Sequence, residues 1–305
     1  MKCNICPREC LADRDNGQLG ACGVDNKIYI ARAALHMWEE PCISGSEGSG
    51  AVFFVGCSLG CIYCQNVKIS RGEFKRSDSL CGDSFVSKYK SVTTDELADI
   101  FIDLQNQGAN NINLVTPTHY SYQIIEAVKN AKRKGLLIPI VYNCSGYEKV
   151  QTLKDLEDVV DIYLVDFKYM DRVLAKQYSY AENYPEIAKL SLEEMVRQCG
   201  QFEFDDRGIM RRGVIVRNLL LPGHVKNSKD VLKYVYETYG DNVYMSVMNQ
   251  YTPLEQVQDV SPLNRKVTKR EYNRLVDFVL ELGAENVFIQ EGDVASESFI
   301  PDFGG

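Results

Sequence analysis

The sequence lacks the long apolar runs and the surplus of basic residues that mark whole classes of protein. No apolar run in its 305 residues approaches the roughly 20 residues of a membrane-spanning helix, so we expect no membrane partner. The first residues, Met-Lys-Cys-Asn-Ile-Cys-Pro, contain no hydrophobic signal core. The net charge of −8 argues against non-specific nucleic-acid binding, although a local basic pocket could still hold a small anionic substrate.

Cysteine, by contrast, is abundant, with eleven copies. In a short secreted domain this number would predict disulfides. The chain is long and its cysteines are clustered, which favours metal ligation in a reducing compartment. We therefore expect a cytoplasmic protein. Hydrophobic residues make up 45% of the chain and charged residues 25%, enough for a sizeable core in one large domain or two small ones.

Three cysteines, Cys57, Cys61 and Cys64, have the spacing C-x3-C-x2-C and follow the apolar run Ala51–Val55. The run reads as a buried strand, and glycines after it allow a tight loop. Three thiolates suit three corners of a cubic iron–sulfur cluster, which normally takes four cysteines. The missing fourth ligand leaves one iron open, as in a catalytic metal site. A zinc loop, or cysteines that are merely buried together, would not explain the strand, the glycines and the triad at once.

From residue 51 onward, short apolar runs alternate with amphipathic segments. The expected strands are Ala51–Val55, Asn111–Val115, Ile138–Tyr142, Asp161–Val165, Val214–Leu220, Val243–Met248 and Val287–Gln290. The expected helices are Asp95–Gln107, Tyr122–Lys134, Glu148–Leu156, Asp171–Tyr178, Leu192–Gly200, Lys229–Tyr239 and Lys269–Leu282. Capping-box patterns predict three of the helix starts, at Thr93-x-x-Glu96, Ser191-x-x-Glu194 and Thr268-x-x-Glu271.

This alternation predicts a parallel sheet with right-handed crossovers. About six units are too few for a closed eight-stranded barrel, so we predict an α/β fold, a partial (β/α)6 TIM-like barrel with ligands at the carboxyl ends of its strands. Residues 1–50 lack the alternation and should form a Cys-rich, metal-binding N-terminal extension. Residues 51–305 should form the barrel and a C-terminal extension. The long irregular linkers 65–91 and 251–267 are candidate lids over the substrate.

The triad resembles the signature of the radical SAM superfamily, and Tyr63, just before the last cysteine, also fits that signature. The resemblance implies a [4Fe–4S] cluster whose open iron binds S-adenosylmethionine. It further implies an external one-electron donor, a flavodoxin or ferredoxin, and reductive cleavage of the cofactor to a 5′-deoxyadenosyl radical that removes hydrogen from a substrate. Partial (β/α)6 barrels are typical of the superfamily.

Further segments resemble the branch of pyruvate formate-lyase activating enzymes, within it the group described as putative activating enzymes, a kind of oxidoreductase. The match runs nearly end to end. Its landmarks are Cys3–Cys10, Glu39-Glu40-Pro41, Gly48–Phe54, Asn113–Tyr120, Tyr142–Tyr147, Asp161–Tyr169, Val216–Gly223 and Met248–Pro253. A shared fold and cofactor do not by themselves define a substrate.

The resemblance assigns roles to several residues at strand ends. Lys168 of the Asp166-x-Lys168 pattern should face the carboxylate of S-adenosylmethionine, a favourable charge pairing at low dielectric, although a surface ion pair is the alternative. Asn143 and Ser145 lie in the loop that helps hold the cofactor and, in relatives, a monovalent cation; Asn143 replaces the acidic cation ligand. Arg217 matches an arginine that approaches the cofactor.

The superfamily's Gly-Gly-Glu, whose backbone holds the cofactor's amine, is absent after the second strand, where Thr116-Pro-Thr-His-Tyr120 stands instead. The proline removes a backbone donor, so Thr116, Thr118 or nearby carbonyls should bind the amine. His119 is a candidate proton donor or substrate ligand. A capping or hydrogen-bonded structural histidine is the alternative.

Four cysteines near the N-terminus, Cys3, Cys6, Cys10 and Cys22, could hold a second [4Fe–4S] cluster or a zinc ion. The C-x3-C step departs from the paired C-x2-C of zinc ribbons and favours iron–sulfur. The site could cap the barrel, relay electrons or bind substrate.

Three functions follow from these patterns. A radical SAM enzyme acting on a small molecule or peptide is slightly favoured, because the N-terminal extension and the two linkers could narrow the barrel mouth. The alternatives are an activating enzyme that installs a glycyl radical on a partner protein, and a non-catalytic metal-binding regulatory protein.

Overall fold

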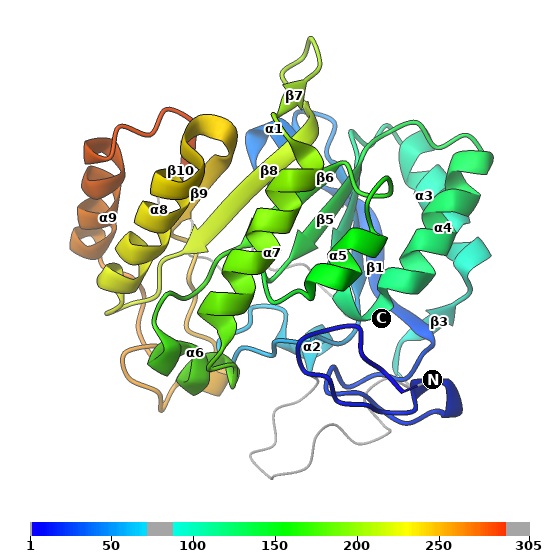
Figure 1. Ribbon diagram of the computed structural model, residues 1–305, viewed down its shortest axis with the longest axis horizontal. Coiled ribbons are helices and arrows are strands. Elements are labelled where there is room, and N and C mark those ends of the chain that lie inside the picture. The colour runs from blue at the N-terminus through cyan, green and yellow to red at the C-terminus, as the bar shows by residue number, and fades with distance from the viewer. Residues whose placement is uncertain (1, 72–87, 291–305) are drawn as a thin grey trace.

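The computed structural model describes residues 2–71 and 88–290, and its centre is a mostly parallel sheet with helices packed along one side (Figure 1). Within those residues the strand order is β10-β9-β8-β6-β5-β4-β2-β1-β3, and β7 pairs with β8. Neighbours from β2 to β10 are parallel, whereas β1 and β3 add antiparallel strands beyond β2. The strands are β1 (Ile28–His36), β2 (Ser49–Phe54), β3 (Lys90–Val92), β4 (Ile112–Val115), β5 (Ile140–Cys144), β6 (Ile162–Asp166), β7 (Glu203–Phe204), β8 (Met210–Leu219), β9 (Tyr244–Met248) and β10 (Val287–Ile289).

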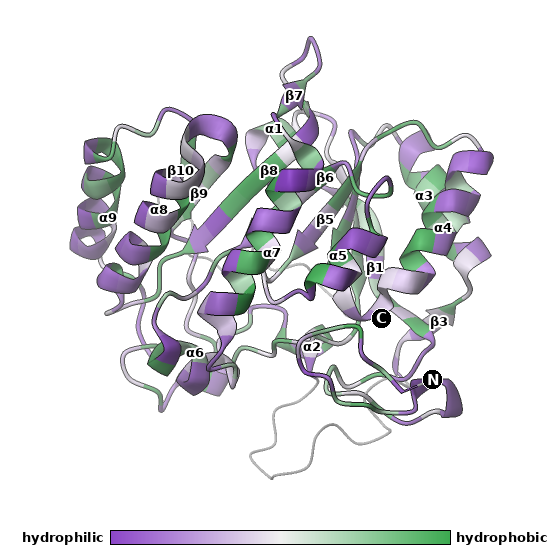
Figure 2. Ribbon diagram, in the orientation of Figure 1, coloured by the Kyte–Doolittle hydropathy of each residue, from purple (hydrophilic) through white to green (hydrophobic). Residues whose placement is uncertain are grey.

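The sheet confirms the predicted α/β fold, and each predicted strand corresponds to an observed one. The helices are α1 (Pro41–Ser44), α2 (Val67–Ser70), α3 (Thr94–Asn106), α4 (Ser121–Arg133), α5 (Val150–Asp155), α6 (Arg172–Ser179), α7 (Tyr184–Cys199), α8 (Val225–Tyr239) and α9 (Lys269–Glu281). They turn apolar stripes toward the sheet and polar faces outward (Figure 2). In α4 the buried Ile124, Ala127, Val128 and Ala131 recur every three or four residues.

Two of the three predicted capping boxes are confirmed. The hydroxyls of Thr93 and Thr268 each accept a hydrogen bond from the backbone N–H of the glutamate three residues on, and the backbone N–H of each threonine donates to the carboxylate of that glutamate. The third is wrong, because α7 begins at Tyr184, with a proline in its first turn. Ser191 lies in the middle of α7, where its hydroxyl donates to the carbonyls of Glu148 and Ile187.

Residues 28–36 form a strand that the sequence analysis did not predict. In β1 buried residues at the start give way to partly exposed ones, so neither a continuous apolar run nor a clear alternation marks it. It pairs antiparallel with β2 from Ile30 opposite Phe54 to His36 opposite Ser49. The expected boundary at residue 50 falls inside β2, so part of the N-terminal segment belongs to the barrel sheet.

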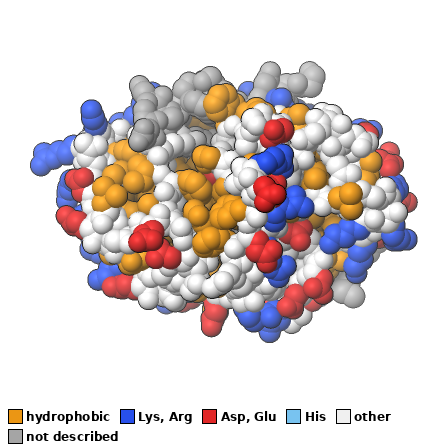
Figure 3. Space-filling view, turned by 90° about the horizontal axis from the view of Figure 1, so that it is seen from above, with side chains coloured by type: hydrophobic (Ala, Val, Ile, Leu, Met, Phe, Trp, Pro, Cys, Tyr) orange, Lys and Arg blue, Asp and Glu red, His pale blue; other side chains and the backbone are white. Residues whose placement is uncertain are grey.

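The face of the molecule from which β7 projects carries hydrophobic side chains near its middle, with acidic and basic groups around them (Figure 3). At the start of β9, Tyr244 contacts Phe202 edge-on at 4.9 Å between ring centroids and stacks on Phe288 at 5.2 Å. Phe288 also lines the cavity described below. None of the helices in the described ranges has the length and apolarity of a membrane span.

Of the two candidate lids, linker 65–91 lies partly outside the described residues. Linker 251–267 is packed: Tyr251 is buried, and its hydroxyl donates to the Leu263 carbonyl at 2.6 Å. The predicted C-terminal extension after residue 290 also lies outside the described residues.

Candidate cofactor site

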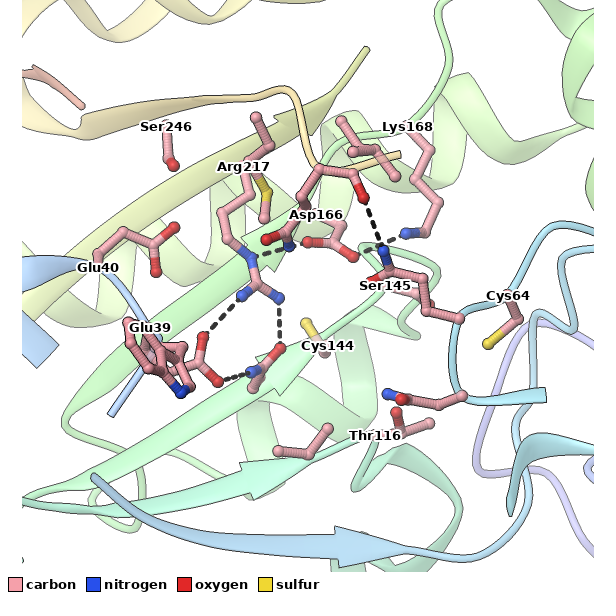
Figure 4. Close-up of a pocket in the computed structure, with 18 of the residues that line it drawn as sticks. Glu39, Glu40, Cys64, Thr116, Cys144, Ser145, Asp166, Lys168, Arg217 and Ser246 are labelled. Carbon is pink, nitrogen blue, oxygen red and sulfur yellow. Dashed lines mark hydrogen bonds and ion pairs between the residues drawn. The ribbon is translucent and has the colours of Figure 1, made fainter. Parts of the chain in front are cut away.

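A cavity of about 530 Å³ lies at the carboxyl ends of the parallel strands. Because β4, β5, β6 and β8 end at the same edge of the sheet, residues far apart in sequence meet there. The cysteine loop after β2 and the segment after β1 line the rest of the cavity (Figure 4). Most of the predicted cofactor residues face it: Tyr63, Thr116, Asn143, Ser145, Asp166, Lys168 and Arg217.

The three cysteines of the C-x3-C-x2-C motif all line this cavity. Gly56 starts their loop with a φ of +95°, and an added Cβ would meet the carbonyl oxygen of Cys22 at 2.8 Å. A glycine is therefore needed where the loop leaves β2. Each sulfur accepts a hydrogen bond, and the donor–acceptor pairs are Gly60 N–H to Cys57 Sγ at 3.4 Å, Ser179 Oγ to Cys61 Sγ at 3.1 Å and Ser70 Oγ to Cys64 Sγ at 3.5 Å.

The thiols of the triad influence one another. Burial and, to a smaller extent, the neighbouring triad thiols raise the pKa of Cys57 and raise that of Cys64 to about 12. A cationic metal centre would offset this repulsion and stabilise the thiolates. The described residues contain no group of three or more His, Cys, Asp or Glu side chains that could hold one metal ion. An iron–sulfur cube places several irons between its ligands and needs wider spacing, so the donor set fits a cluster better than a single zinc.

A chain of alternating charges runs through the cavity beside the cysteines (Figure 4). Lys168 Nζ lies 2.7 Å from Asp166 Oδ2, and Asp166 Oδ1 lies 2.9 Å from Arg217 Nε. The last two residues are register partners on β6 and β8, which explains why they meet. Burial opposes the charge on Asp166, but Arg217 and Lys168 outweigh it and lower the pKa of the carboxyl. The same aspartate raises the pKa of Lys168 against the effect of burial. The pair is thus not a surface pair.

Glu39 continues this chain, although the sequence analysis gave it no role. Its Oε2 lies 3.0 Å from Arg217 Nη1, and its Oε1 accepts hydrogen bonds from Asn113 at 2.9 Å and Asn143 at 3.3 Å. Arg217 Nη2 also donates to Asn143 Oδ1 at 2.6 Å. The amide of Asn143 is therefore held between the carboxylate of Glu39 and the guanidinium of Arg217. The only sequence signal for Glu39 was its place in the Glu39-Glu40-Pro41 landmark.

Tyr63 faces the cavity from within an aromatic cluster. Its hydroxyl accepts a hydrogen bond from Tyr169 at 2.8 Å, and its ring meets those of Tyr178 and Tyr251 edge-on. These contacts fix its orientation beside Cys64.

Thr116 and Thr118 have different places. Thr116 lines the cavity with the unusual φ of +59°, and its N–H donates to the Asn143 carbonyl at 2.9 Å. Thr118 is buried, and its hydroxyl donates to Glu148 Oε1 at 3.0 Å. It is not among the residues that line the cavity, so the structure does not bring it to the expected cofactor site.

His119 corrects an expectation as well. It does not line the cavity, is 1% exposed, and its Nε2 lies 2.8 Å from the Val55 carbonyl. Burial and the nearby Arg14 guanidinium lower the pKa of its imidazole to about 3. A neutral ring bound to the end of β2 supports the loop, as in the structural alternative, and has no geometry for donating a proton to a ligand in the cavity.

The four N-terminal cysteines lie together beneath the cysteine loop. An added Cβ on Gly20 would meet Cys22 Sγ at 3.2 Å and Cys10 Sγ at 3.6 Å, so these two sulfurs flank one point. Burial and, to a smaller extent, nearby thiols of the quartet, Cys3 among them, raise the pKa of Cys6 to about 12 and raise that of Cys22. This donor set is chemically suited to a thiophilic metal.

The N-terminal segment is joined directly to the cysteine loop. Cys57 N–H donates to the Cys22 carbonyl at 3.1 Å. The guanidinium of Arg8 donates to four carbonyls, those of Ser58, Leu59, Ser179 and Tyr180. The segment therefore supports the loop instead of hanging free of it.

Several known proteins resemble this chain in sequence or in fold. Residues 51–202 match the family model of the Radical SAM superfamily. An uncharacterized protein of Methanocaldococcus jannaschii is 25% identical over 288 residues, which cover 94% of this chain and 76% of that protein. A radical SAM methyltransferase from Sphaerobacter thermophilus has a similar fold, with a TM-score of 0.50 and 15% identity, over 79% of this chain and 66% of that one. Streptococcus suis SuiB, solved with S-adenosylmethionine bound, gives a TM-score of 0.46 at 11% identity, over 78% of this chain and 49% of that one.

Proposed function

The chain belongs to the radical SAM superfamily through residues 51–202, and on this premise we propose that it is an enzyme whose cluster is held by Cys57, Cys61 and Cys64. When bound, the [4Fe–4S] cluster and S-adenosylmethionine supply a 5′-deoxyadenosyl radical that removes a hydrogen atom from the substrate. The observation that carries the proposal is that the three cysteines and the buried charges of Lys168, Asp166 and Arg217 line the same cavity.

The residues around the cavity would hold the cofactor in a fixed orientation. Lys168 has the charge to pair with its carboxylate, and Asp166 keeps that ammonium protonated and in place. Thr116 and Ser145 offer hydroxyls at the ends of β4 and β5. Tyr63, held by its aromatic neighbours, would exclude water beside the cluster.

We propose a small molecule or peptide as the substrate, because packed chain borders the cavity beside the cysteine loop. Gln256 Nε2 donates to the Cys64 carbonyl at 3.0 Å, and Gln65 Nε2 donates to the Gln250 carbonyl at 2.8 Å. The linker 251–267 is therefore attached to the cysteine loop. A volume of about 530 Å³ lies within the range of small-molecule sites. A glycyl-radical protein, the substrate of an activating enzyme, would have to insert a loop past this linker.

Cofactor cleavage tests the function. Anaerobically reconstituted protein given dithionite and S-adenosylmethionine should form 5′-deoxyadenosine slowly even without substrate. Replacing Cys57, Cys61 and Cys64 together by alanine should remove close to four irons and abolish the product. Cys199→Ala, which removes a buried thiol away from the cavity, is the matched control. Bound cofactor without any cleavage in fully clustered enzyme would favour the non-catalytic regulatory alternative.

Two further arms concern partners. A flavodoxin or ferredoxin should replace dithionite as the electron donor. Electron paramagnetic resonance of reduced enzyme incubated with cofactor and candidate glycyl-radical proteins of the same organism should show no glycine-centred doublet. Such a doublet would establish the activating-enzyme alternative and refute the proposed substrate class.

We also propose that Cys3, Cys6, Cys10 and Cys22 hold a second metal centre, an iron–sulfur cluster by the same argument from spacing, with zinc as the alternative. The mutual influence of their thiols and their bonding to the cysteine loop support it. The Cys57/Cys61/Cys64 triple variant should keep about four irons or one zinc, and further replacement of Cys3 and Cys6 should remove them. A metal-free triple variant would contradict the second site.

A further inference from the structure

One buried acid in the cavity has no use in the cofactor site described above. Glu40 lines the cavity and is 7% exposed, and its Oε2 has no hydrogen-bond partner among the described residues. Its neighbour Glu39 differs, because both of its oxygens are bound. In Figure 4 Glu40 lies across the cavity from Cys64, beyond Arg217 and near Ser246. A buried acceptor left open in this way requires a donor.

We propose that Glu40, together with Trp38, binds a cationic group of the substrate, a primary ammonium or a guanidinium. The inference rests on the proposed function, since it names the substrate class of the same cavity. It commits to the chemistry of the bound group and leaves its carrier, a free amine or a basic side chain of a peptide, to be decided by experiment.

No ion pair joins a described lysine or arginine to Glu40, although the charge of Arg217 acts on it from a distance. Lys168 is paired with Asp166, and Arg217 already donates to Asp166, Glu39 and Asn143. Burial raises the pKa of Glu40. Arg217 and a hydrogen bond with Ser246 offset part of this rise, and the charge of Glu39 adds to it. A ligand cation would supply the missing donor and the missing positive charge at once.

Trp38 adds the second element of a cation site. It lines the same cavity two residues before Glu40, and 67% of its surface is exposed. Indole is the aromatic ring that binds cations best, and a carboxylate beside it provides the counter-charge. Phe288 and His36 also line the cavity and give it further aromatic surface.

The charged side chains also differ between the two ends of the cavity. Lys168 stands on the side of the cysteines, whereas Glu39 and Glu40 stand on the far side (Figure 4). A substrate whose cation binds at Glu40 would extend its remaining atoms toward the cluster. The hydrogen to be removed would then lie several bonds from the charged group.

Trp38 is the only tryptophan of the chain, so its fluorescence reports on this end of the cavity. The reconstituted full chain is titrated with n-butylammonium and n-butylguanidinium at constant ionic strength, and with n-butanol as the neutral control. Both cations should give a saturable change, and butanol should bind at least tenfold more weakly. Glu40→Gln should weaken cation binding at least tenfold, while the exposed Glu126→Gln on α4 should leave it unchanged.

Two arms complete the test. The peptide acetyl-Gly-Lys-Gly-amide should bind like butylammonium if the cation comes from a peptide, and not at all if it comes from a free amine. Equal binding of ammonium and alcohol by the wild-type chain, a comparison that needs no variant, would overturn the inference. Loss of cation binding with 5′-deoxyadenosine still formed would refute only this subsite. Cation binding without any deoxyadenosine would refute only the proposed function.

Discussion

Arg217 should be one of the largest single contributors to stability in the cavity, and Arg217→Met tests this. Arg217 is 9% exposed, and its guanidinium bonds to Asp166 at 2.9 Å, Glu39 at 3.0 Å and Asn143 at 2.6 Å. Methionine keeps most of the stem but leaves two buried carboxylates without their main counter-charge. Breaking a buried ion pair from one side costs about 3–5 kcal/mol, so the free energy of unfolding should fall by that amount at pH 7.

The control is Arg207→Met. Arg207 is also paired with an aspartate, Asp205, at 2.9 Å, but its side chain is 54% exposed. Exposed pairs contribute about 0–1 kcal/mol, so this variant should differ little from wild type. The two variants remove the same chemical group and differ chiefly in burial.

The stability lost in Arg217→Met should also depend on pH. Burial opposes ionisation of Asp166, and Arg217 with Lys168 lowers its folded pKa overall. A lowered carboxyl pKa contributes stability above the unfolded value of about 4, and this stability is lost as the pH falls through the folded pKa. In the variant the carboxyls can take up protons, so the difference from wild type should shrink between pH 7 and pH 4.

Urea denaturation followed by circular dichroism, under anaerobic reducing conditions at pH 7, 5.5 and 4, measures both effects. A loss below about 1 kcal/mol for Arg217→Met, equal to that of Arg207→Met, would show that the buried charge chain does not stabilise the fold. A penalty that grew toward low pH would refute the charge assignment itself.

Three further predictions concern the support of the site. Gly56→Ala should lower the melting temperature by several degrees more than Gly108→Ala, since both glycines have φ above +90° but only Gly56 faces a backbone carbonyl; equal losses would refute the close-approach argument. Arg8→Ala removes the four-carbonyl contact and should lower iron retention by the Cys57 loop at least twofold after desalting; unchanged iron content would exclude that support. Burial raises the pKa of Glu148 to about 7. The stability that this carboxyl contributes is therefore fully present below its unfolded pKa of about 4.5 and is lost as the pH rises through 7. Between pH 5 and pH 8 the free energy of unfolding of Glu148→Gln should therefore rise by on the order of 3 kcal/mol relative to that of wild type. Parallel curves of unfolding free energy against pH for the two proteins would contradict this.

Some features of this protein were determined by local sequence alone. The apolar runs predicted β2, β4, β5, β6, β8, β9 and β10 because a strand buried on both faces needs a continuous apolar stretch. The spacing of Cys57, Cys61 and Cys64 after one such run placed three sulfurs on one loop. Asp166 and Lys168 could be found because they end a strand, and parallel strands end at one edge.

Other features depended on contacts between distant segments. Glu39 reaches Arg217 across 178 positions. Because β1 pairs antiparallel with β2, it ends at the amino edge of the sheet, with His36 opposite Ser49, and the segment that follows lines the cavity from that side. The local pattern of β1 gave no sign of this, since a partly exposed strand beside an antiparallel neighbour needs no apolar run. The same segment brings Glu40, whose Oε2 has no hydrogen-bond partner among the described residues, to the cavity.

Contacts with distant segments also decide which side chains of the turn after β4 face the cavity. Thr116, Thr118 and His119 are equally polar and close in sequence, yet only Thr116 faces the cavity. Thr118 and His119 lie in the short helical turn that follows, and buried acceptors at Glu148 and Val55 draw them inward. Sequence fixes which polar groups stand near a strand end, whereas the buried partners, which come from elsewhere in the chain, decide which of them remain available to a ligand.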